Sequence, residues 1–131
     1  MYIFGTINTT DQAIAVDGTV NLGSVYRRYD RKGSCGCRIF ELDGNSIALQ
    51  SAGIYHLTAV IESSADTTFQ LFENGVANPN AITTTGVLDV YVLVDNKCTF
   101  NTISALKNIS IVNTGAAVTV TNIVINIDKV V

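Results

Sequence analysis

The sequence predicts an all-β domain, a sandwich or a barrel of antiparallel strands. Apolar residues occur in short runs rich in Val, Ile, Thr, Tyr and Phe, and Gly, Asn, Asp and Ser separate these runs. No window repeats apolar residues at helical spacing. Several of the breaks are dipeptides that form tight hairpin turns, among them Asp43-Gly44 and Asn74-Gly75.

Each run between two breaks is expected to form a strand. In chain order the expected strands are 2–7, 13–16, 19–26, 38–42, 46–49, 53–62, 68–73, 81–85, 87–94, 97–101, 109–113, 117–120 and 123–129, and some of them are halves of one bent strand. Turn residues at Asp17-Gly18 and at Asn113-Thr-Gly115 mark two further breaks. Pro79, the one proline of the chain, belongs in a loop or at a sheet edge because it lacks the N–H that a central strand needs.

The strand 53–62 is apolar on both of its faces. Alternation places Tyr55, Leu57, Ala59 and Ile61 on one face and Ile54, His56, Thr58 and Val60 on the other. The strand 123–129 behaves similarly, with three isoleucines on one face. Since a sandwich has one inner face per sheet, the second semi-apolar face is expected to meet another subunit.

Composition agrees with an oligomer of single-domain chains. The 131 residues and 14.0 kDa fit one domain, 1–131, in which 1–37 is a candidate N-terminal docking segment. Hydrophobic residues make up 47%, charged residues 15%, and the mean hydropathy is +0.33. No apolar run approaches the roughly 20 residues that span a bilayer, so we expect no membrane partner and attribute the hydrophobicity to burial between subunits. The N-terminus lacks the features of a signal peptide, so we expect synthesis in the cytoplasm of a cell without export by the general route.

Charge argues against nucleic acid as a partner and marks one segment of the chain. The net charge is −3 and the isoelectric point is near 4.8. Most of the basic residues nevertheless cluster early in the chain, at Arg27, Arg28, Arg31, Lys32 and Arg38. This segment is interpreted either as a solvated turn or as a docking surface that several subunits present together to an acidic partner.

One stretch of the chain resembles a known superfamily. The segment "SIALQSAGIYHLTAVIE", with its Gly53-Ile54-Tyr55 motif, resembles the central strand pair of the tumour-necrosis-factor and complement globular-head superfamily. The segments 69–81 and 108–130 resemble the strands that follow in that superfamily. The resemblance is to the microbial type, which is found in phage virion proteins and at the C-terminus of spore-surface collagen-like glycoproteins. No collagen-like Gly-X-Y stalk precedes the domain in this sequence.

The resemblance implies a ten-stranded antiparallel jelly-roll sandwich that forms a homotrimer, binds partners or decorates a surface, and carries no chemistry. The residues that we expect at the trimer interface on this basis are Tyr55, His56, Leu57, Phe69, Leu71, Ile123 and Ile125.

A zinc site is the main alternative in which side chains would bind a cofactor. Cys35, Cys37, Cys98 and His56 would supply three sulfurs and one nitrogen, the ligand set of a structural zinc. The spacing Cys-x-Cys is shorter than the usual two to four intervening residues, so we expect no metal and no cofactor, with three reduced thiols behaving as small hydrophobes. A Cys35–Cys37 disulfide would close a strained ring, whereas a bridge between subunits stays open because the number of cysteines is odd.

His56, the one histidine of the chain, is the other candidate for chemistry. A catalytic base needs a nucleophile and an orienting carboxylate within reach, and the sequence contains no Gly-x-Ser-x-Gly nucleophile elbow. We therefore predict that the protein is not an enzyme and that His56 is an interface residue, which in a trimer would act as a pH-sensitive contact.

The sequence analysis leads to two hypotheses on function. The first is a structural protein of the virion surface, a trimeric phage capsid decoration or head-fibre protein on the capsid exterior, whose partner is the major capsid protein or another virion surface. The second is a trimeric module that binds a glycan or receptor on a host surface through loops around 74–85.

Overall fold

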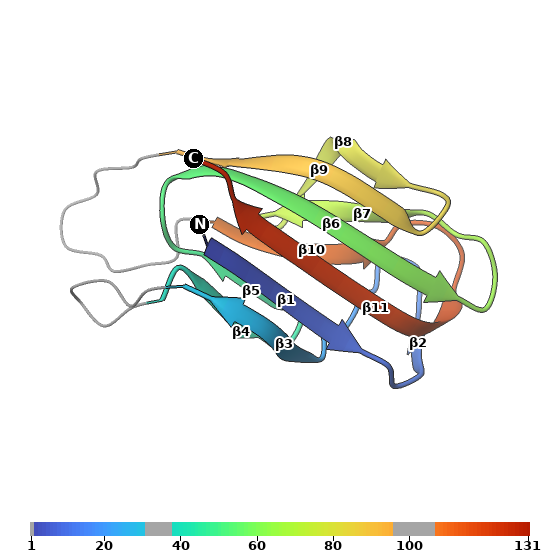
Figure 1. The fold of residues 1–131 in the computed structure, drawn as a ribbon. Coiled ribbons are helices and arrows are strands. Elements are labelled where there is room, and N and C mark those ends of the chain that lie inside the picture. Colours follow the sequence, from blue (N-terminus) through green and yellow to red (C-terminus); the bar gives the residue numbers. More distant parts are fainter. Residues whose placement is uncertain (1, 31–37, 96–106) are drawn as a thin grey trace.

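The computed structural model describes residues 2–30, 38–95 and 107–131, and it is all-β in this part of the chain. Two antiparallel sheets pack face to face (Figure 1). The strands are β1 (Tyr2–Asn8), β2 (Gln12–Ile14), β3 (Ser24–Tyr29), β4 (Phe40–Asp43), β5 (Ser46–Leu49), β6 (Gly53–Ser63), β7 (Phe69–Glu73), β8 (Val76–Thr83), β9 (Val87–Val94), β10 (Lys107–Asn113) and β11 (Val118–Lys129). The described residues thus form eleven strands, where the resemblance implies ten. None of them builds a helix long and apolar enough to cross a membrane.

The six-stranded sheet has the order β3-β1-β11-β6-β9, and β2 pairs with one end of β11. The five-stranded sheet has the order β4-β5-β10-β7-β8. β1 and β11 run antiparallel in register, with Tyr2 opposite Lys129, so the first strand begins where the last one ends (Figure 1). Within the segment 1–37, β1, β2 and β3 are strands of the six-stranded sheet, and docking by this segment stays a prediction.

Most predicted strands are found within a few residues of their expected bounds, and the differences have physical causes. The predicted strand 19–26 is broken at Gly23, whose φ of 79° turns the chain before β3 begins. The predicted halves 117–120 and 123–129 are one strand, β11, with a bulge between Val120 and Asn122. Pro79 lies inside β8, which is tolerated because β8 is an edge strand. The predicted strand 97–101 lies outside the described residues.

The turn chemistry read from the sequence is confirmed at the β7–β8 hairpin. Asn74 and Gly75 both have positive φ, 53° and 78°, as a type I′ turn requires. At the β4–β5 hairpin the two turn residues are Gly44 and Asn45, one position later than Asp43-Gly44, and Gly44 has φ 56°.

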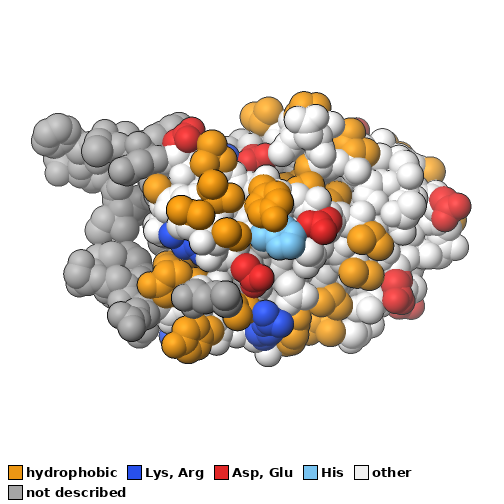
Figure 2. Space-filling view, turned by 45° about the horizontal axis from the view of Figure 1, so that its top comes forward, with side chains coloured by type: hydrophobic (Ala, Val, Ile, Leu, Met, Phe, Trp, Pro, Cys, Tyr) orange, Lys and Arg blue, Asp and Glu red, His pale blue; other side chains and the backbone are white. Residues whose placement is uncertain are grey.

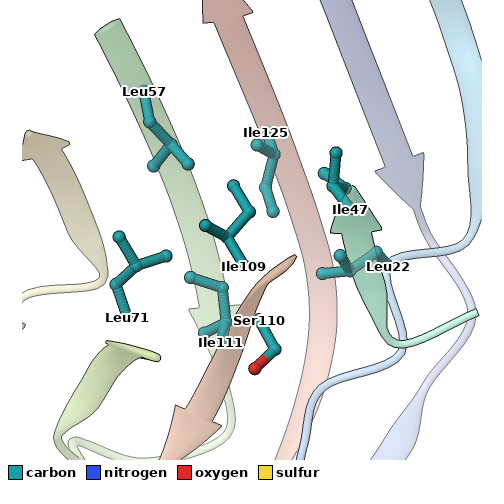
Figure 3. Close-up of a pocket in the computed structure, with 8 residues that line it drawn as sticks. All are labelled: Leu22, Ile47, Leu57, Leu71, Ile109, Ser110, Ile111 and Ile125. Carbon is teal, nitrogen blue, oxygen red and sulfur yellow. The ribbon is translucent and has the colours of Figure 1, made fainter. Parts of the chain in front are cut away.

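The core lies between the sheets. Figure 3 shows its centre, where Leu57 and Ile125 from the six-stranded sheet face Leu71, Ile109 and Ile111 from the five-stranded sheet. The space between these side chains is too narrow to admit a water molecule. This region is therefore packed core and not a ligand cavity.

An aromatic stack closes the core at the end where β1 begins. Phe4 stacks on Phe40 with ring centroids 5.1 Å apart, and Phe40 meets the ring of Tyr55 edge-on at 5.7 Å. Since Phe40 belongs to the five-stranded sheet and the other two rings to the six-stranded sheet, the stack joins both layers.

Candidate functional site

Six of the seven residues predicted at a trimer interface are enclosed in the core of the single chain. Each is at most 2% exposed, and the six are Tyr55, Leu57, Phe69, Leu71, Ile123 and Ile125. A side chain that its own chain surrounds has no surface left for a second subunit, so the prediction is wrong for these six residues. His56 points to the opposite side of β6 and is partly exposed.

A group of exposed apolar residues lies on the outer face of the six-stranded sheet, the side turned away from the five-stranded sheet. Cross-strand pairs on this face join β6 to β9, with Ile54 opposite Leu93 and Val60 opposite Val87. All four side chains are exposed. Together with Tyr91, which is 66% exposed, they form what we call the β9 half of the outer face. Figure 2 shows hydrophobic side chains gathered around the histidine on this face.

His56 lies within the β9 half and is held on two sides. Its Nε2 lies 2.5 Å from Oδ1 of Asp89, and its ring stacks on Tyr91 with centroids 4.8 Å apart. Asp128 of β11 is its cross-strand neighbour on the other side. In the described part of the chain no serine or threonine hydroxyl is hydrogen-bonded to the ring, so the histidine–carboxylate pair has no nucleophile beside it. The geometry fits a fixed surface contact better than a catalytic base.

The opposite edge of the same face is aromatic and basic. The ring of Tyr26 lies over Gly5, where an added Cβ would come within 2.7 Å of Cε1 of the tyrosine. The hydroxyl of Tyr26 donates a hydrogen bond to Oδ1 of Asn126. Arg27 and Tyr29 extend from the same strand, opposite Gly5 and Ile3 of β1. We call these residues, Ile3, Tyr26, Arg27 and Tyr29, the β3 half of the outer face.

The predicted capsid-docking residues do not form one free patch. The carboxylate of Asp30 has no exposed surface, and it lies 3.3 Å from Nη1 of Arg28 and 3.2 Å from Nη1 of Arg38. Arg28 also covers the ring of Phe4 at 4.8 Å and donates a hydrogen bond to the carbonyl oxygen of Phe40. These two arginines hold the fold together around a buried charge.

The other predicted docking residues divide into two groups. Arg27 lies exposed on the sheet face, and the nearest carboxylate in its own chain is Asp128, 4.0 Å away. Arg31 and Lys32 lie outside the described residues, so docking by them stays a prediction.

Three of the four residues considered as zinc ligands, Cys35, Cys37 and Cys98, also lie outside the described residues. Within the described ranges no group of three or more His, Cys, Asp or Glu is placed to hold a metal.

The Gly53-Ile54-Tyr55 motif has a structural role. Gly53 has φ 151°, and a Cβ added to it would lie 2.2 Å from the carbonyl oxygen of Val131, so the C-terminal residues can pack here only against glycine. The hydroxyl of Tyr55 donates a hydrogen bond to the carbonyl oxygen of Ser51, 2.5 Å away. Burial raises the pKa of Tyr55 to about 12.

A hollow of about 260 Å³ opens at the end of the sandwich away from the C-terminus. Its polar rim carries the carboxylates of Glu62 and Asp66 and the hydroxyls of Thr84 and Thr85. Of the predicted binding loops around 74–85, residues 76–83 form β8 and do not line this hollow, whereas Thr84 and Thr85 do.

Comparison with solved structures identifies the fold. The globular domain of zebrafish complement 1qA protein matches with a TM-score of 0.60 and 8% identity, over 100% of this chain and 98% of that one. Murine APRIL matches with a TM-score of 0.58 and 12% identity, over 98% of each chain. The vertex protein P5 of PRD1 matches with a TM-score of 0.58 and 13% identity, over 96% of this chain and 93% of that one.

The chain has the TNF/C1q-type jelly-roll fold. No protein-family model matches the sequence, and no curated protein sequence matches it. The likeness is therefore one of structure at low identity, and the predicted resemblance is confirmed at the level of the TNF/C1q-type fold, which includes a viral vertex protein.

Proposed function

We propose that this protein is a non-enzymatic, homotrimeric structural protein of a virion surface, a capsid decoration or head-fibre protein of a bacteriophage. The observation that carries the proposal is the structural likeness to the PRD1 vertex protein P5, which extends over nearly the full length of both chains. The site that supports self-association is the outer face of the six-stranded sheet, with its exposed apolar pairs.

The outer face of the six-stranded sheet is expected to be buried in an interface in the functional protein. Monomeric proteins rarely expose a large apolar patch, and β9 is the edge strand of this sheet among the described strands. Contact with further copies of the chain would bury both. The same contact accounts for the high share of hydrophobic residues in a chain of this size.

Sedimentation velocity of the purified protein tests self-association. We expect a particle of three times the 14.0 kDa chain mass at micromolar concentration. Leu93→Asp, which places a charge in the β9 half, should shift the protein to smaller species, whereas Val76→Asp, a change at an exposed residue of β8 on the other sheet, serves as the matched control. A wild-type monomer at all concentrations would contradict the proposal.

Docking on the capsid is tested separately with purified particles. The variant Arg31→Glu with Lys32→Glu should lose co-sedimentation with particles and keep its oligomeric state, because it reverses charge in the basic segment and leaves Asp30, Arg28 and Arg38 unchanged. Unchanged co-sedimentation would remove the basic segment from the docking surface. Arg28 and Arg38 are unsuited to this test because they stabilise a buried carboxylate.

A second candidate function, recognition of a host-surface glycan, is favoured by the polar hollow between β6, the β6–β7 connection and the β8–β9 turn. Carboxylates and hydroxyls that face a solvent-filled hollow are the groups that hydrogen-bond sugar hydroxyls. A glycan array with the wild-type protein and with Glu62→Ala/Asp66→Ala tests this candidate. Binding that the double variant loses would support it, and absence of binding by the wild type would remove it.

A further inference from the structure

The two edges of the outer face differ in a way that suits contact between copies. The β9 half combines four aliphatic side chains with Tyr91 and carries a carboxylate, Asp89, whose side chain is 64% exposed. The β3 half is aromatic and carries a guanidinium, Arg27. The strand order places β3 and β9 at opposite edges of one sheet, with β1, β11 and β6 between them. One edge of the face therefore carries an exposed carboxylate and the other an exposed guanidinium, which has Asp128 of its own chain 4.0 Å away.

The difference between the two halves matters because it determines which symmetric oligomer they can form. A two-fold dimer brings a surface patch against a copy of itself, whereas a closed ring of three identical chains needs two different patches that fit each other. A mainly aliphatic patch that carries Asp89 and an aromatic patch that carries Arg27 meet that requirement. Two copies of the β9 half, by contrast, would bring Asp89 near another Asp89.

The two charged groups have unused bonding capacity. Asp89 accepts one hydrogen bond, from His56 to its Oδ1, and its side chain is 64% exposed. Arg27 lies 4.0 Å from Asp128, at the outer limit of an ion pair, and no described residue accepts a hydrogen bond from its guanidinium. A guanidinium offers five donors, and a carboxylate can accept two of them in parallel.

Both halves are also held rigid before any contact forms. In the β3 half, Tyr26 is fixed over Gly5 by its hydrogen bond to Asn126. In the β9 half, the stack of His56 on Tyr91 and the hydrogen bond to Asp89 fix all three side chains. Preorganised aromatic side chains beside an arginine are typical of the residues that contribute most to binding at protein interfaces.

We propose that the β9 half of one copy packs against the β3 half of the next, and that Arg27 of one copy pairs with Asp89 of its neighbour around a closed trimer. This assignment rests on the proposed homotrimer and names the surfaces that form it. It places Arg27 between subunits and leaves the capsid to other residues.

A charge swap tests the pairing. Arg27→Asp and Asp89→Arg, each alone, bring like charges together at every contact, so the trimer should dissociate at concentrations at least about tenfold higher than for wild type. The double variant restores opposite charges and should return the midpoint of dissociation to within about threefold of wild type. Asp11→Arg, at an exposed residue outside the sheet face, is the control and should leave the midpoint unchanged.

Sedimentation equilibrium across a dilution series provides the readout, and circular dichroism verifies that each variant is folded. If a charge-reversed chain does not fold, Arg27→Gln and Asp89→Asn replace it, and the double-mutant cycle then measures the same coupling. Single variants that match wild type, or a double variant that is no better than the singles, would overturn the pairing while the trimer stands. A wild-type chain that is monomeric would overturn the trimer itself.

Discussion

The buried carboxylate of Asp30 allows a quantitative test of how the basic segment is held. Asp30→Asn keeps the shape of the side chain and removes its charge, so Arg28 and Arg38 lose the partner between them. We expect a lower free energy of unfolding because both guanidiniums are left beside a neutral amide. The effect should be larger than that of any neutralised aspartate on the surface.

The geometry sets the magnitude. A charge pair 3.3 Å apart is worth about 5 kcal/mol at an effective dielectric constant of about 20. Desolvation of the carboxylate offsets most of this attraction, and the two arginine side chains are still 21% and 36% exposed, which screens them. Hydrogen bonds to charged groups contribute about 1.5–3 kcal/mol net. We therefore expect Asp30→Asn to cost about 2–3 kcal/mol in total.

Urea unfolding at one fixed protein concentration measures this cost, because the stability of an oligomer depends on concentration. Asp11→Asn is the control, since Asp11 is exposed and makes no ion pair among the described residues; it should change the free energy of unfolding by less than about 0.5 kcal/mol. If Asp30→Asn is as mild as the control, the two arginines are not held by Asp30, and their assignment to the fold instead of the capsid is wrong.

Three further predictions concern single residues. Burial raises the pKa of Tyr55 to about 12, so between pH 10 and 12 the tyrosine ionises in the unfolded chain before it ionises in the folded one. Over this range wild type should lose up to about 2.7 kcal/mol of unfolding free energy relative to Tyr55→Phe. Urea titrations of both proteins at several pH values measure the difference, and parallel curves would contradict it. Gly53→Ala should destabilise by at least about 2 kcal/mol more than Gly75→Ala, because both glycines have positive φ but only the Cβ at position 53 would meet backbone, and thermal melts of the two variants should separate accordingly. Asn113→Ala should lower the free energy of unfolding by about 3 kcal/mol, because the buried amide accepts a hydrogen bond from Thr67 in the β6–β7 connection and donates one to Ala116 in the β10–β11 connection. A loss below about 1 kcal/mol in urea unfolding would show that these hydrogen bonds are dispensable.

The sequence predicts the strands and the turns well because both are encoded locally. Alternation identifies the two faces of β6 correctly, and Asn74-Gly75 forms the expected hairpin turn. Alternation does not say which face is inward when both are apolar. The family resemblance places Tyr55 at the trimer interface, but the face of β6 that carries Tyr55 is buried in the core. The exposed apolar pairs, such as Ile54 with Leu93, lie on the opposite face.

The electrostatics could not be predicted for a related reason. In the sequence, Arg28 and Arg38 belong to a run of positive charge, and the single Asp30 among them looks like one more exposed polar residue. In the folded chain its carboxylate lies against the guanidiniums of Arg28 and Arg38 and the backbone N–H of Phe40, and this arrangement forms only when distant segments meet. The pairing of His56 with Asp89 likewise depends on the β6–β9 register, which joins residues 33 positions apart.

The position of β11 governs the order in which the six-stranded sheet can form. β11 follows every other described strand in the sequence, yet it lies in the middle of this sheet, between β1 and β6, and also pairs with β2. β1 cannot pair on that side until residues 118–129 have been synthesised, so the sheet depends on contacts between residues far apart in the sequence, which slows folding and leaves apolar strands exposed to other chains. Deletion of residues 118–129 would separate β1 and β3 from β6 and β9, and we expect the remaining chain not to fold.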